Sequence, residues 1–151
     1  MPRVEEAVVV AASIAETWNG YLDPRGWSTW VDAFQGVVAN DGYPQQGGKL
    51  TWRSTPAGRG EVTEEVLEHE PRRLHHVAFS DPTMSGELVT RFEGEGSGTK
   101  VSQSLEYRLA ERGPFAVLGA FFVKSQIARS LDRTLGDLKA YVEEVANANA
   151  R

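Results

Sequence analysis

The chain has no cysteine among its 151 residues. Disulfide bridges, thiolate-bound zinc and cysteine nucleophiles are therefore excluded, and the absence is compatible with a reducing compartment. Basic residues are in the minority, with 16 Lys and Arg against 21 Asp and Glu, which gives a formal net charge of −5. Because a nucleic-acid partner is held through cationic groups on its phosphates, this balance argues against nucleic-acid binding.

Long hydrophobic runs are also missing. The run from Ala7 to Ala12 is too short for a membrane helix and lacks the cationic flank of a secretion signal. We therefore expect no stable membrane insertion and a cytoplasmic location.

What is present is typical of a globular domain, with 40% hydrophobic and 25% charged residues. A chain of this length fits one domain, which we expect to span residues 1–151 and to bury a real core.

Local signals divide the chain into strands and short helices. Ser13 and Glu16 have the spacing of a capping box, and Asp23-Pro24 offers a cap followed by a first helical residue. The glycine-rich stretch 93–98 is typical of a hairpin turn. We expect strands at about 3–12, 35–40, 48–54, 60–69, 74–79, 86–92 and 99–109, and short helices at about 14–22 and 24–30.

The last element is a long amphipathic helix that follows Gly113-Pro114. Its apolar or small residues recur at spacings of mostly three and four: Val117, Phe121, Ala128, Leu131, Leu135, Leu138, Val142 and Val145. The helix is about 30 residues long and so spans roughly 45 Å. It needs a large apolar partner, and the strand-rich middle supplies the candidate. The chain is therefore α+β.

The order of the elements, together with the turn and cap residues between them, resembles that of the START-like (SRPBCC) superfamily with its helix-grip, birch-pollen-allergen-like fold. Within it, the sequence is most similar to the polyketide cyclase/dehydrase and lipid-transport proteins. The residues that carry the resemblance are Ala11-Ala12-Ser13, Trp18, Leu22-Asp23-Pro24, Trp27, Trp30, Gly47-Gly48, Leu50, Glu68 to Leu74 and Gly98 to Val101.

The resemblance implies a curved antiparallel sheet of about seven strands wrapped around the long C-terminal helix, with two short helices after the first strand. It also implies a ligand cavity between sheet and helix, and no metal or nucleotide cofactor. Such a cavity binds mainly by burying apolar area, while a few polar groups fix the ligand's orientation.

Aromatic and polar side chains on several segments are candidates for lining that cavity, although each is also a plausible core residue. Adjacent residues on a helix point about 100° apart, so Phe121 and Phe122 cannot both face one core, and we expect one of them at the cavity or its entrance. The candidate ligand contacts are Trp27, Trp30, Phe34, Trp52, Phe79, Phe92, Gln103, Tyr107, Phe121, Phe122 and Ser125.

Catalytic candidates are fewer: His69, Tyr107 and Gln103. His75 and His76 would point to opposite faces of a strand, so we expect no metal site. Aromatase/cyclases of this fold place an arginine on the fourth strand and a hydroxyl residue two positions before it. The matching positions here hold His69 and Leu67, so those roles do not carry over.

The inward face of the strand 60–69 stays open. Hydrophobicity favours Val62 and Val66, which brings Glu64 inward with them, whereas the cyclase comparison favours the face of His69. A bulge would reconcile the two. A buried glutamate would have a raised pKa and would be a candidate general base.

Three functions fit these observations. The first is the binding of a small hydrophobic ligand, such as a lipid, polyketide or isoprenoid, by a monomer or homodimer without a cofactor. The alternative is a polyketide cyclase/dehydrase-type enzyme that promotes enolisation or water loss in a chain held in the cavity. The third is an interaction module of the co-chaperone kind.

Overall fold

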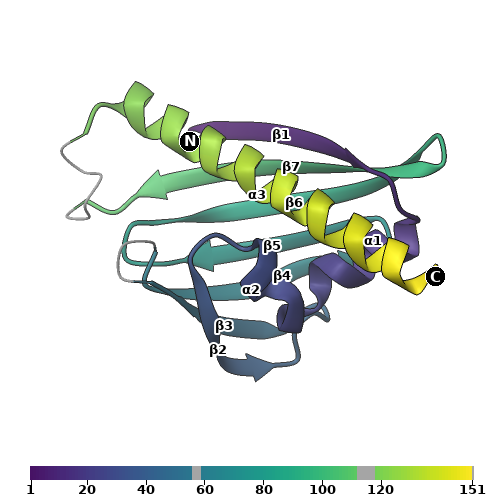
Figure 1. Ribbon diagram of the computed structural model, residues 1–151. Coiled ribbons are helices and arrows are strands. Elements are labelled where there is room, and N and C mark those ends of the chain that lie inside the picture. The colour runs from purple at the N-terminus through teal and green to yellow at the C-terminus, as the bar shows by residue number, and fades with distance from the viewer. Residues whose placement is uncertain (56–58, 112–117, 151) are drawn as a thin grey trace.

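The computed structural model describes residues 1–55, 59–111 and 118–150. A seven-stranded antiparallel sheet curves beneath a long C-terminal helix, as Figure 1 shows. The strands are β1 (Arg3–Val10), β2 (Phe34–Asp41), β3 (Lys49–Ser54), β4 (Glu61–Glu70), β5 (Leu74–Ser80), β6 (Met84–Glu95) and β7 (Gly98–Leu109). The helical segments are α1 (Ile14–Leu22), a 3₁₀ turn (Pro24–Gly26), α2 (Trp27–Trp30) and α3 (Ala120–Asn149).

The strand order is β1-β7-β6-β5-β4-β3-β2, so β1 and β2 form the edges. The helices gather on one face, where α3 crosses the sheet diagonally and α1 and α2 lie beside its C-terminal half (Figure 1). This confirms the α+β helix-grip architecture. None of the helices in the described segments is both long enough and apolar enough to span a membrane.

The predicted helix starts are confirmed at atomic detail. The Ser13 side chain accepts a hydrogen bond from the Glu16 backbone, and the Glu16 carboxylate accepts one from the Ser13 backbone, which completes the capping box. Asp23 caps the next segment by accepting from the backbone N–H of Arg25. These caps satisfy N–H groups that have no partner within the helix.

Several boundaries differ from the expected ones. β1 ends at Val10, before the Ala11-Ala12 pair, and β6 extends to Glu95. Gly96, with φ 60°, then occupies a two-residue turn that joins β6 to β7, a backbone conformation that glycine adopts without strain. Val117, which we placed on the long helix, and Gly113-Pro114, which we placed before it, lie outside the described residues.

A bulge in β4 settles which residues of that strand face inward. Val66 pairs with Val77 and Glu68 pairs with His76, so Leu67 is an extra residue on β4. Before the bulge, Val62 and Val66 are buried on the concave face. After it, the alternation shifts by one residue and His69 turns inward. Both candidate inward faces of the strand are therefore correct: the face of Val62 and Val66 before the bulge, and the face of His69 after it.

The core consists of two hydrophobic clusters along α3. The first surrounds α1, α2 and the C-terminal half of α3, where Leu135, Leu138 and Val142 are buried. The second lies under the N-terminal part of α3 and contains Val123 and Ile127. Leu88 on the central strand β6 is only partly buried and packs against both clusters. Leu88 therefore connects the two clusters.

Glycine at position 86 is required by the close approach of β6 to β7. A Cβ atom at this position would lie 1.9 Å from the backbone oxygen of Glu106, so Gly86→Ala must displace the strand pair. We expect a loss of about 1–3 kcal/mol in the free energy of unfolding. Gly136→Ala is the control: a Cβ there meets nothing within 4 Å, and we expect a gain of roughly 0.5–1 kcal/mol from helix propensity. Urea titrations of both variants test this, and equal effects would contradict it.

Candidate functional site

A row of polar side chains crosses the otherwise apolar concave face. The row follows the cross-strand pairs of the sheet and consists of His69 on β4, His75 on β5, Thr90 on β6, Gln103 on β7 and Glu6 on β1. His75, Thr90 and Gln103 are buried. Their neighbours on the same strand faces are apolar: Val77, Leu88, Phe92, Val101 and Leu105. Burying so many polar groups in one line costs free energy unless each has a partner.

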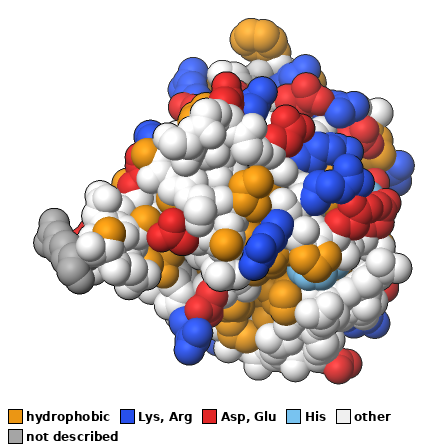
Figure 2. All heavy atoms as spheres, turned by 90° about the vertical axis from the view of Figure 1, so that its right-hand side faces the viewer, with side chains coloured by type: hydrophobic (Ala, Val, Ile, Leu, Met, Phe, Trp, Pro, Cys, Tyr) orange, Lys and Arg blue, Asp and Glu red, His pale blue; other side chains and the backbone are white. Residues whose placement is uncertain are grey.

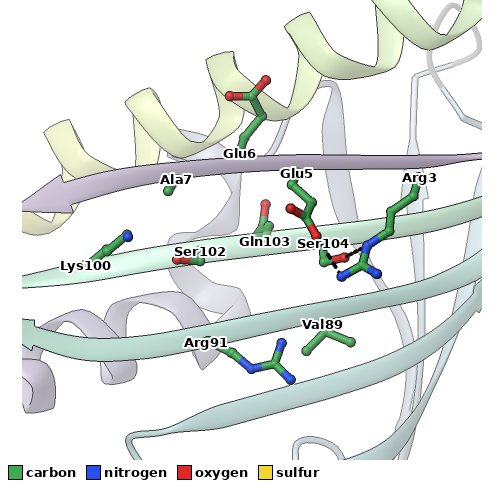
Figure 3. A pocket seen from close by; sticks show the side chains of 10 residues that line it. All are labelled: Arg3, Glu5, Glu6, Ala7, Val89, Arg91, Lys100, Ser102, Gln103 and Ser104. Carbon is green, nitrogen blue, oxygen red and sulfur yellow. Dashed lines mark hydrogen bonds and ion pairs between the residues drawn. The ribbon is translucent and has the colours of Figure 1, made fainter.

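Figure 3 shows the end of this row from the outer side of the sheet. Glu6 projects from β1 toward α3, whereas its neighbour Glu5 points away from the helix. The successive side chains of a strand alternate between the two faces. Glu6 therefore belongs to the concave face, where it is partly buried.

Tyr21 joins α1 to the row. Its hydroxyl lies 2.8 Å from Thr90 Oγ1 and accepts a hydrogen bond from Gln103 Nε2 at 3.2 Å. Gln103 Nε2 also donates to Thr90 Oγ1 at 3.2 Å. Burial raises the pKa of Tyr21 to about 12, so the phenol stays protonated. The three side chains form one neutral hydrogen-bonded group.

Aromatic side chains of α1 and α2 pack around the polar row. The Trp18 ring lies 5.2 Å from the His69 ring and 5.0 Å from the Phe92 ring, measured between centroids. The Tyr21 ring lies 5.5 Å from that of Trp30 and 6.2 Å from that of His75. These edge-on and tilted contacts are the favourable arrangements for aromatic pairs.

Three buried polar atoms beside Tyr21 have no hydrogen-bond partner among the described residues. They are the indole Nε1 of Trp30, Nε2 of His75 and Oε1 of Gln103. All three residues are less than a tenth exposed. Buried polar atoms are nearly always hydrogen-bonded, so a group of unpaired ones is unusual and points to a further partner.

Glu64 adds a carboxyl group to the concave face on the other side of the β4 bulge. Its Oε2 accepts a hydrogen bond of 2.6 Å from the indole of Trp52. Burial raises the pKa of Glu64, and this effect outweighs the opposing effects of the Trp52 hydrogen bond and the Arg59 charge. The glutamate that the sequence offered as a candidate general base therefore does face the interior.

The predicted ligand contacts lie in different parts of the structure. Trp27, Trp30, Trp52 and Phe92 are buried in the first cluster with Phe34 packed against them, while Phe79 and Tyr107 are buried in the second. Gln103 lies in the polar row, and Ser125 is partly buried on α3. The exposed pair is Phe121 and Phe122, at 87% and 50% of their surface. Neither phenylalanine enters the core, so ligand contact at these two positions stays a prediction.

The three catalytic candidates are not brought together. His69 and Gln103 are in the same row but three strands apart, which is about 14 Å at the usual strand spacing. Tyr107 belongs to the second cluster, where burial raises its pKa. His75 and His76 do face opposite sides of β5: His75 is buried inside, and His76 lies near Glu68 and Glu87 on the outer face.

Tyr21 and Thr90 are site residues that the sequence analysis did not name. Tyr21 lies on the short helix expected at about 14–22. Thr90 carried a usable signal, because it is the polar member of the alternating inward set Leu88, Thr90 and Phe92. A single hydroxyl residue within an apolar, inward-facing set is therefore a sequence signal for a buried polar contact.

The outer face of the sheet has a hollow of its own, of about 380 Å³. Small side chains at Ala7, Ser102 and Ser104 form its floor, between Arg3 and Lys100 (Figure 3). Arg3 is already engaged there, since its guanidinium reaches Glu5 at 2.6 Å and Ser104 at 2.9 Å. The hollow is open and polar, and within it Arg3 and Glu5 pair with each other.

The buried imidazole of His75 predicts an acid-dependent loss of stability. Burial, with smaller effects from His69 and His76, lowers the pKa of His75 from 6.5 to about 3. Between these values the unfolded chain binds a proton that the folded protein does not, so stability falls as the pH drops below about 6.5. This group contributes a slope of at most about 1.4 kcal/mol per pH unit, and none above that window.

Denaturant titrations from pH 4 to pH 7.5 test this slope against His75→Gln, which removes the titrating group. We expect the variant to show the shallower pH dependence. Parallel curves for the two proteins would contradict the assignment.

Comparison with known proteins places this geometry in a family. A family model described as polyketide cyclase / dehydrase and lipid transport matches residues 1–143. No curated protein matches the chain.

Solved structures share the fold at low sequence identity. Ara h 8.0201 has a TM-score of 0.73 at 13% identity, over 93% of this chain and 97% of that one. A protein from Geobacillus kaustophilus has a TM-score of 0.74 at 12% identity, over 95% and 96%. DynU16, from the dynemicin biosynthetic locus, has a TM-score of 0.66 at 20% identity, over 93% of this chain and 47% of its own. These likenesses concern the fold, and the family match covers nearly the whole sequence: the chain belongs to the polyketide cyclase/dehydrase and lipid-transport family.

Proposed function

We propose that the protein binds a small hydrophobic molecule between the concave face of the sheet and α3. The observation that carries this proposal is the group of unpaired atoms on Trp30, His75 and Gln103, buried in an aromatic-lined interior. A bound molecule with a polar end would supply the partners that these atoms lack.

The partial exposure of Leu88 supports the same location. Leu88 faces the concave side in the middle of the sheet, between Thr90 and the second cluster, yet it keeps access to solvent. On α3, Leu131 is also only partly buried and packs against the second cluster. An inward side chain that stays accessible borders open space, and apolar area buried there would contribute about 25 cal/mol per Å² to binding.

One end of the molecule carries an apolar surface patch (Figure 2). Figure 2 shows hydrophobic side chains gathered around a histidine at the end where α1 and the C-terminus of α3 lie. The lipid-transport part of the family description supports a ligand of this class.

A pair of adjacent substitutions on β6 tests the location. Leu88→Trp fills the space between the two clusters, whereas Val89→Trp adds the same side chain to the outer face, where Val89 lines the hollow. With the uncharged fluorescent probe N-phenyl-1-naphthylamine, we expect Leu88→Trp to weaken binding about tenfold or more, the loss of roughly 1.4 kcal/mol. We expect Val89→Trp to bind as the wild type does.

Thermal unfolding of both variants shows that the comparison is between folded proteins. Absence of probe binding to the wild type, or an equal effect of the two substitutions, would overturn the proposal. Native mass spectrometry of the purified protein adds an independent check, because a carrier of apolar molecules is expected to retain one.

A second candidate function, catalysis, is favoured by Glu64. A carboxyl group whose pKa is raised by burial is a stronger base, when ionised, than an exposed one, and Glu64 has this property on the concave face. Such a base would remove a proton beside a ligand carbonyl and promote enolisation. His69 and Gln103 lie on the same face but belong to the polar row, and Glu64 replaces them as the leading candidate.

The catalytic reading is tested by hydrogen–deuterium exchange at the α-carbon of 1-tetralone, followed by NMR. An enzyme with Glu64 as its base accelerates the exchange, and Glu64→Gln loses the acceleration, by about 10²-fold or more, while binding of the fluorescent probe is kept. Equal exchange rates with and without the wild-type protein would leave binding as the function.

A further inference from the structure

The polar atoms of the row and of its aromatic cover specify what kind of polar end the ligand carries, an inference that rests on the proposed function. An indole Nε1 is a donor only, so Trp30 requires an acceptor from the ligand. The amide Oε1 of Gln103 is an acceptor only, so it requires a donor. Both side chains flank Tyr21, one through ring contact at 5.5 Å and the other through a hydrogen bond. Together the two unpaired atoms call for one acceptor and one donor from the ligand.

Charged groups near this face disfavour an anionic ligand. Two carboxyl groups, of Glu6 and Glu64, lie on the concave side. The cation that approaches it is Arg59, whose guanidinium stacks on the rings of Trp52 and Phe79. Arg59 is already paired with the fully buried carboxylate of Asp81 at 2.8 Å. A ligand carboxylate would therefore lie near carboxyl groups and would leave Oε1 of Gln103 without a donor.

A cationic ligand is disfavoured by the hydrogen-bond donors. An ammonium group donates only, so it leaves the Trp30 indole without an acceptor. The imidazole of His75 also resists a positive charge, because burial lowers its pKa. A charged ligand end would also lose its hydration on entering the row, which is costly unless a counter-charge pairs with it closely.

We propose that the ligand's polar end is an uncharged hydroxyl or hydroxy-ketone group, held beside Tyr21 by Trp30 and Gln103, and that the site selects such molecules over carboxylates and amines of the same length. The apolar body of the ligand would extend along Leu88 toward the second cluster.

Three probes with one chain length test the selection: dodecan-1-ol, dodecanoate and dodecylamine, each used to displace N-phenyl-1-naphthylamine at pH 7.5. We expect dodecan-1-ol to displace the probe at a concentration about tenfold lower than either charged molecule, since burying an unpaired charge costs more than burying a satisfied hydroxyl. Displacement by dodecanoate or dodecylamine at the same or a lower concentration would overturn the inference and leave the proposed function intact. Absence of probe binding would instead contradict the proposed function.

Gln103→Leu removes the acceptor, and Ser102→Ala on the outer face of the same strand is its control. We expect Gln103→Leu to reduce the preference for the alcohol several-fold without abolishing probe binding, and Ser102→Ala to keep the preference. An unchanged preference in Gln103→Leu would contradict the role of this residue. If Gln103→Leu does not fold, the comparison of the three probes on the wild type still decides the inference.

Discussion

The hydrogen bonds of Tyr21 with Thr90 and Gln103 connect the first helix to the floor of the sheet, and the arrangement of the interior depends on them. They fix a phenol from α1 above two central strands at 2.8–3.2 Å. Around this point the aromatic rings of Trp18, Trp30 and Phe92 are held at contact distance. Because these side chains are uncharged and hydrogen-bonded to one another, burying them within an apolar face costs less free energy than burying unpaired polar groups.

The second constraint is the division of the core along α3. The helix crosses the sheet diagonally (Figure 1), and its buried residues belong to two clusters rather than one. Leu88 on the central strand packs against both clusters and is only partly buried. The two ends of α3 are therefore anchored separately, with Leu88 as the shared contact between them.

Local signals made most of the fold predictable. The capping box at Ser13, the alternation in β3 and the spacing of apolar residues in α3 each depend on nearby sequence, and each is confirmed. The arrangement of these elements in space was inferred from the resemblance to the family. The site was less predictable because its contacts join residues far apart, such as Tyr21 and Gln103. The bulge at Leu67 is a further example: no residue there signals it, and only the pairing of β4 with β5 reveals that Glu64 and His69 share a face.

Polar groups on the two faces of the sheet differ in how well they are satisfied. On the outer face, Arg3 contacts Glu5 and Ser104, whereas Nε2 of the partly buried His76 has no hydrogen-bond partner in the described segments and lies 3.6 Å from Glu87. The exposed contacts of Arg3 contribute little to stability, and solvent could replace them. On the inner face, the unpaired atoms of Trp30, His75 and Gln103 have lost solvent without gaining a protein partner. A sequence selected only for stability would place apolar residues at those positions. Among the described residues, three such atoms lie on the concave face and one, Nε2 of His76, on the outer face. This concentration supports the proposed location of the site.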